Sequence, residues 1–129
     1  MRVFKTIAFA KFARKQRIVD VTLCEAVSRA LRGQIDASLG GQLIKQRVPR
    51  QGQGRSGGFR TIIALKLRER AVFLYGFAKN NQDNISSVDL SRLKILGAAL
   101  LEAGRGGIEA LIADGEIFEV VCDGEEISK

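Results

Sequence analysis

The chain has 129 residues, of which 46% are hydrophobic and 27% are charged, and its formal net charge is +7. This length and composition predict a single globular domain over residues 1–129 and exclude a disordered chain. Because the chain has no histidine and only two cysteines, its residues predict no metal site and no cofactor.

Two features bear on the compartment in which the protein works. The apolar run at residues 95–101 is far shorter than the roughly 20 residues that span a bilayer. Cys24 and Cys122 lie far apart in apolar surroundings, which favours two thiols in a reducing compartment over a disulfide. We therefore expect a cytoplasmic protein with no membrane partner.

The first 50 residues predict a strand, a helical hairpin and a second strand. Residues 3–7 suit a short strand, and apolar spacings of three and four predict a helix over 8–15. A second helix is expected from Asp20, its N-cap, to about residue 32, with Gly33 ending it. The Leu-Gly-Gly sequence at 39–41 predicts a turn, and residues 43–48 predict a strand that Pro49 stops.

The middle of the chain carries the clearest hairpin pattern. Residues 59–68 and 71–79 are rich in β-branched and aromatic residues and are separated by a charged turn. If Leu67 pairs with Val72, then Arg60 lies directly opposite Lys79. Like charges in such a position destabilise a sheet, so this pairing would indicate an anion between them.

The last third predicts a helix over 88–103 with Ser86 or Ser87 as its cap, then a break at 104–107. A short helix over 108–113 and a strand over 116–121 are expected to follow. From about residue 104 the chain is an acidic C-terminal extension.

The most informative feature is the charge between residues 45 and 79, where nine Lys or Arg residues accompany a single acid, Glu69. This block surrounds a glycine-rich loop at 51–58, and together they suit a phosphate backbone. Glycines such as Gly57 and Gly58 permit the backbone conformations that form anion-binding nests. The alternative is a solvated strand face beside a loop that merely connects two strands.

Two aromatic residues share one face of the predicted strand over 71–79. Tyr75 and Phe77 are spaced by two and are candidates to stack on unpaired bases while neighbouring cations hold phosphates. The alternative is that both rings pack in the core against a helix.

Two runs carry a family resemblance. The first, at residues 44–63, begins with the basic strand and reads Ile-Lys-Gln-Arg-Val-Pro-Arg-Gln-Gly-Gln-Gly-Arg-Ser-Gly-Gly-Phe-Arg-Thr-Ile-Ile. The second, at residues 75–86, reads Tyr-Gly-Phe-Ala-Lys-Asn-Asn-Gln-Asp-Asn-Ile-Ser. Their order resembles the toxin subunits of bacterial RelE/ParE-type toxin–antitoxin systems, and more closely the RelE/HigB-like branch. The resemblance implies an α+β fold, with a small antiparallel sheet and helices packed on one of its faces.

The same resemblance implies a ribosome-dependent mRNA endonuclease and a cognate antitoxin that covers the basic surface. Operator DNA would be a partner only through the antitoxin complex. By motif position it implicates six basic residues and adds one aromatic residue: Lys45, Arg47, Arg50, Arg55, Arg60, Lys79 and Tyr75. Of these, Arg50 and Arg55 are expected to bind RNA with Gly57, Gly58 and Phe77, and the others to act in catalysis.

Cleavage of RNA by the neighbouring 2′-hydroxyl needs a base, an acid and cations that stabilise the charge on phosphorus. Without histidine, the available groups are lysine, arginine and tyrosine. Arginine stays charged and clamps phosphate with two hydrogen bonds, so Arg47, Arg55 and Arg60 suit that role. Lys45 or Lys79 is the candidate acid–base group.

Three other functions stay open on the sequence alone. A similar fold could poison DNA gyrase, as ParE-like toxins do. The cations could serve a nucleic-acid-binding protein without catalytic activity, or a degenerate toxin that keeps only its antitoxin and operator contacts. The clustered cations at 45, 47, 55 and 60 favour the endonuclease over the gyrase poison.

Overall fold

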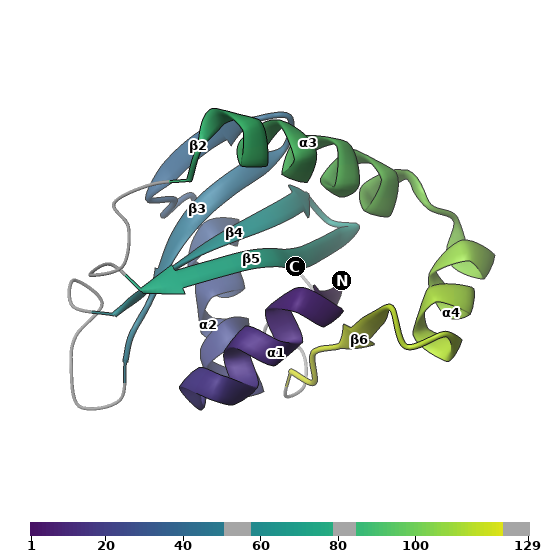
Figure 1. The fold of residues 1–129 in the computed structure, drawn as a ribbon, viewed down its shortest axis with the longest axis horizontal. Helices are drawn as coiled ribbons and strands as arrows, with labels where there is room; N and C mark the ends of the chain where they lie inside the picture. Colours follow the sequence, from purple (N-terminus) through teal and green to yellow (C-terminus); the bar gives the residue numbers. More distant parts are fainter. Residues whose placement is uncertain (51–57, 79–84, 123–129) are drawn as a thin grey trace.

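A computed structural model describes residues 1–50, 58–78 and 85–122 of the chain. In this part, one six-stranded sheet has the order β2-β3-β4-β5-β1-β6 and is accompanied by four helices (Figure 1). The elements in chain order are β1 (Arg2–Thr6), α1 (Ile7–Gln16), α2 (Asp20–Leu31), β2 (Ala37–Gly40), β3 (Leu43–Val48), β4 (Phe59–Lys66), β5 (Arg70–Ala78), α3 (Ser87–Glu102), α4 (Arg105–Ala113) and β6 (Ile117–Glu119). No helix among these is both long and apolar enough to cross a membrane.

The predicted α+β class and the N-terminal helical hairpin are confirmed, but the prediction of an antiparallel sheet was wrong. β1 enters the sheet between β5 and β6 and runs parallel to β5. The prediction of a simple turn at 39–41 missed β2, which pairs with β3 before Gly40 and Gly41 turn the chain with positive φ angles of 80° and 60°.

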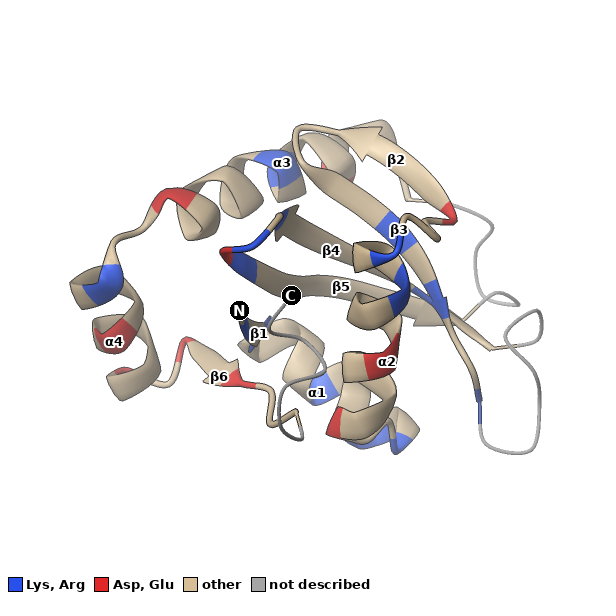
Figure 2. Cartoon of the chain, turned by 180° about the vertical axis from the view of Figure 1, so that it is seen from behind, with Lys and Arg blue, Asp and Glu red and all other residues tan. Residues whose placement is uncertain are grey.

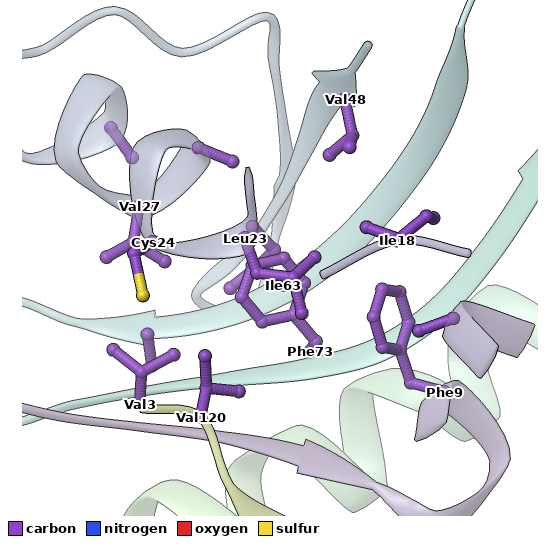
Figure 3. Packing of buried hydrophobic residues seen from close by; sticks show 14 of the residues in the cluster. Val3, Phe9, Ile18, Leu23, Cys24, Val27, Val48, Ile63, Phe73 and Val120 are labelled. Atoms are coloured by element: carbon purple, nitrogen blue, oxygen red, sulfur yellow. The ribbon is translucent and has the colours of Figure 1, made fainter. Parts of the chain in front are cut away.

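The helices cover both faces of the sheet, so the prediction that they share one face was also wrong. α1 and α2 pack on one face through a cluster that contains Phe9, Leu23 and Phe73 (Figure 3). α3 lies across β4 and β5 on the other face, where Leu74 and Leu100 belong to a second cluster (Figure 1). β4 and β5 alternate between the two clusters, which explains why these strands are apolar on both sides.

The hairpin of β4 and β5 has a different register from the predicted one. Lys66 pairs with Arg70 across a three-residue turn, in which Arg68 adopts a left-handed φ of 68°. A bulge at Leu74 then shifts the register again. Arg60 therefore lies opposite Phe77, and the predicted pairing of Arg60 with Lys79 was wrong.

The two cysteines form a disulfide, so the prediction of two free thiols was wrong. The Cα atoms of Cys24 in α2 and Cys122 after β6 are 5.8 Å apart. Two hydrogen bonds hold the C-terminal segment in place: the main-chain N–H of Val120 donates to the carbonyl of Val3 in β1, and that of Val121 donates to Asp20 Oδ2 in α2. Tertiary contacts thus join residues that the sequence separates by 98 positions.

An ion-pair cluster joins β1 to α4 and β6 and makes the stability of the fold depend on pH. The Arg2 guanidinium donates to Glu119 at 2.8 and 2.9 Å and to Glu109 at 2.8 Å. The hydrogen bonds from Arg2 hold the pKa of the Glu119 carboxyl below its ordinary value, and partial burial opposes them. This stabilisation is present above the unfolded-state pKa of about 4.3 and is lost as the pH falls through the folded-state pKa.

We expect Arg2→Met to lower the free energy of unfolding at pH 7 by at most about 1 kcal/mol, because both partners are over 40% exposed. The deficit should shrink as the pH falls below about 4, where Glu119 becomes protonated in the wild type as well. Urea unfolding at several pH values measures it. A deficit that is the same at pH 7 and pH 3 would contradict this role for the ion pair.

Candidate nucleic-acid interface

Five of the predicted site residues lie together on the sheet face that carries α3. In β3, Lys45 and Arg47 alternate with buried residues and share a face with Leu43. The register places them in two rows across three strands: Lys45, Ile62 and Tyr75, then Arg47, Arg60 and Phe77. We call Lys45, Arg47, Arg60 and Tyr75 with Phe77 the β3–β5 face.

The centre of this face is a pair of arginines. Arg47 and Arg60 are direct partners in the β3–β4 ladder, a position in which like charges repel. Asp36 pairs with Arg47 at 3.7 Å, whereas Arg60 has no ion pair within the described residues. In that part of the chain, Arg60 Nη1 is the one buried side-chain nitrogen or oxygen without a hydrogen-bond partner.

An unpaired guanidinium nitrogen in a buried position is costly, and such groups are rare in folded proteins unless a ligand satisfies them. An anion between Arg60 and Arg47 would both complete the hydrogen bonding of Nη1 and relieve the repulsion between the two arginines. The argument for an anion that the sequence raised for Arg60 and Lys79 therefore applies to Arg60 and Arg47.

The two aromatic rings differ in exposure. Their centroids are 5.9 Å apart, but Phe77 is only 4% exposed and packs in the cluster beneath α3. Core packing, the alternative raised by the sequence, accounts for its position. Tyr75 is half-buried, packs against the same cluster and shares its row across the strands with Ile62 and Lys45. Tyr75 is thus the aromatic candidate with accessible surface.

The other predicted RNA-binding residues lie elsewhere or outside the described chain. The Arg50 guanidinium lies 4.7 Å from the centroid of Phe59, whose ring belongs to the cluster on the α1–α2 face. Arg50 is therefore engaged away from the β3–β5 face. Arg55, Gly57 and Lys79 fall outside the described residues.

Gly58 is buried, and its surroundings give a reason for glycine other than a nest. A Cβ atom there would collide with the carbonyl oxygen of Val48 and lie 2.9 Å from the main-chain N of Arg50 and the Cα of Pro49. These contacts are with main chain that cannot rotate away. The glycine permits the strands on either side of residues 49–58 to approach closely.

We expect Gly58→Ala to lower the free energy of unfolding by about 1–3 kcal/mol through this overlap. Thermal or urea unfolding measures the loss, and Gly106→Ala in α4 is a matched control because a Cβ there meets nothing within 4 Å. If both variants unfold like the wild type, the close approach at residue 58 does not constrain the fold.

The basic block is divided between the two ends of the sheet, because Lys66, Arg68 and Arg70 lie at the turn joining β4 and β5 (Figure 2). There Arg70 Nη1 donates to the carbonyls of Leu100 and Ala103 at the end of α3, and Lys66 lies 3.6 Å from two acids. Lys66 and Arg70 thus stabilise the fold, and charge density alone did not distinguish them from the β3–β5 face.

Sequence reasoning also missed the residues that hold Arg47 in place. The main-chain N–H of Arg47 donates to Asp36 Oδ2, and its carbonyl accepts from Arg29 Nη2, each at 2.6 Å. Arg29 is 4% exposed, although it belongs to a residue type that is usually at the surface. The one feature of the sequence that could have indicated this burial is the spacing of Arg29, three residues after Ala26 on the apolar side of α2.

Comparison with known proteins identifies the family of this chain. Residues 1–120 match the sequence model of the family described as "RelE toxin of RelE / RelB toxin-antitoxin system". The chain belongs to this family. The RelE match covers all the described strands and helices, and it makes the chain a toxin of the RelE type whose partner is an antitoxin. No curated protein matched the chain.

Proposed function

We propose that this RelE toxin cleaves mRNA on the ribosome and that the β3–β5 face holds the phosphate at which it cuts. The observation that carries the proposal is the buried, unpartnered Nη1 of Arg60 opposite Arg47. A phosphate carries the charge and the acceptor oxygens that this pair lacks. Family membership supports a toxin, and the endonuclease activity is the part that we propose.

In the proposed reaction the 2′-oxygen loses its proton and attacks the adjacent phosphorus, and the bond from phosphorus to the 5′-oxygen breaks as that oxygen gains a proton. The products are a 2′,3′-cyclic phosphate and a 5′-hydroxyl. Arg47 and Arg60 would stabilise the charge that builds on the phosphoryl oxygens. Lys45 or Lys79 would exchange the protons, and Tyr75 would stack on a base beside the phosphate.

The composition of this face supports the proposed dependence on the ribosome. It lacks histidine, and within the described chain its acid–base candidates are one lysine and one tyrosine. A site with weak acid–base groups gains most from a substrate held in line for attack, because positioning alone can supply a large share of the rate. We propose that the ribosome supplies that positioning, and that the antitoxin blocks the face.

Two purified reactions test the choice of target. The protein is added to a reconstituted bacterial translation reaction and, separately, to DNA gyrase acting on a relaxed plasmid. We expect protein synthesis to stop while supercoiling continues at its normal rate. Inhibited supercoiling with normal translation would instead identify a ParE-like gyrase poison. If both reactions proceed normally while RNA is still bound, a binding protein without catalytic activity is indicated.

A further inference from the structure

The main chain at Arg47 lies beyond the end of the neighbouring strand. β2 begins at Ala37, which pairs with Lys45, so no residue of β2 lies opposite Arg47. The amide and carbonyl of a strand residue need hydrogen-bond partners, and an edge without them is free to shift. At this position two side chains take the place of the missing strand.

The first is Arg29, whose Nη2 donates to the Arg47 carbonyl at 2.6 Å. Its Nε donates to both carboxylate oxygens of Glu25, each at 3.0 Å, one helical turn earlier in α2. Arg29 is only 4% exposed, and its guanidinium is held at Nε by Glu25 and at Nη2 by the Arg47 carbonyl. The guanidinium is therefore a fixed support for β3.

The second is Asp36, whose Oδ2 accepts from the Arg47 amide at 2.6 Å and whose Oδ1 lies 3.7 Å from Arg47 Nε. Asp36 is itself held by Gln46, a fully buried side chain whose Oε1 accepts from the Asp36 amide at 2.9 Å. The Gln46 amide nitrogen donates to the carbonyls of Ala26 and Gln34, which joins α2, β3 and the segment before β2.

From these contacts we infer that Arg29 and Asp36 are positioning residues for Arg47. They hold both its amide and its carbonyl on the edge that β2 does not reach, and so fix the main chain of Arg47 in its place opposite Arg60 in the ladder. This inference rests on the proposed function for its consequence in cleavage. The hydrogen bonds themselves can be tested without it.

Asp36 gives the sharpest test because two substitutions separate position from charge. Asp36→Asn keeps an oxygen that can accept from the Arg47 amide, whereas Asp36→Ala removes it. We expect Asp36→Ala to slow mRNA cleavage on programmed ribosomes by about tenfold or more and Asp36→Asn to cleave within about twofold of the wild type. Equal losses in both variants, or no loss in Asp36→Ala, would overturn the inference.

Arg29→Met is compared with Arg32→Met, which removes the same charge from an exposed position at the end of α2. We expect Arg29→Met to lower the cleavage rate at saturating protein by about tenfold while the half-saturating concentration changes little, and Arg32→Met to change neither. A loss of the same size in both variants would mean that net charge, not position, is responsible. If Arg29→Met does not fold, the comparison of Asp36→Ala with Asp36→Asn decides whether the inference holds.

Hydrogen exchange of the Arg47 amide, followed by NMR in the same variants, is independent of any activity. Exchange should accelerate in Asp36→Ala and stay near the wild-type rate in Asp36→Asn. An unchanged rate in Asp36→Ala would overturn the inference. A wild-type protein that leaves mRNA intact would refute the proposed function, and the exchange result would still decide whether Asp36 holds Arg47.

Discussion

Cys24→Ser is expected to lower the free energy of unfolding by about 4.7 kcal/mol under oxidising conditions. The disulfide joins residues 98 positions apart, and closing a loop of about 100 residues removes that much conformational entropy from the unfolded chain in the simplest model. The folded state also loses a cross-link, because the disulfide holds the segment after β6 against α2. Urea unfolding followed by circular dichroism measures it.

A double variant is the control for this prediction. Cys24→Ser with Cys122→Ser should be insensitive to dithiothreitol, while the wild type should lose stability when dithiothreitol is added. The reduced wild type and the double variant should then unfold at similar urea concentrations. A wild type that unfolds identically with and without reductant, and in which both thiols react under native conditions, would contradict the disulfide.

Arg60→Met is expected to reduce the rate of mRNA cleavage by about 10²–10³, the usual loss when one donor to a developing oxyanion is removed. Methionine keeps much of the aliphatic stem but lacks the guanidinium, so the loss should fall on the chemical step. Fold stability should hold or rise, because the variant removes both the unpartnered Nη1 and the repulsion from Arg47.

Arg105→Met is the matched control. It removes the same charge from an exposed position at the start of α4, which is not part of the β3–β5 face. It should cleave at the wild-type rate. Arg60→Lys should retain part of the activity, since lysine keeps the charge but not the two-pronged geometry. An Arg60→Met protein that cleaves normally would exclude Arg60 from the reaction.

Local elements could be predicted because their signals are local. Residues 43–48 form β3 as predicted, since Pro49 stops the strand. Of the two predicted caps of α3, Ser86 is the one observed, and its side chain accepts from the main-chain N–H of Asp89. Lys45 and Arg47 share a face because they are two residues apart in one strand, which needs no tertiary information. Arg60 joins that face through the pairing of β3 with β4.

Pairing could not be predicted to the residue. A left-handed Arg68 and a bulge at Leu74 each shift the register of β4 and β5, and neither leaves a glycine or proline as a signal. The insertion of β1 beside β5 depends on contacts distant in the sequence, and so does the disulfide. For the same reason the sequence did not reveal Arg29 and Asp36, which reach Arg47 from α2 and from the segment before β2.

The most direct test of the proposed function is to map the 5′ ends of a defined mRNA by primer extension after incubation with the protein, with and without ribosomes engaged on it. The proposal predicts new ends within the translated codons only when ribosomes are present, and fragments that carry a 5′-hydroxyl. Intact mRNA on translating ribosomes, or equal cleavage of naked mRNA, would contradict it.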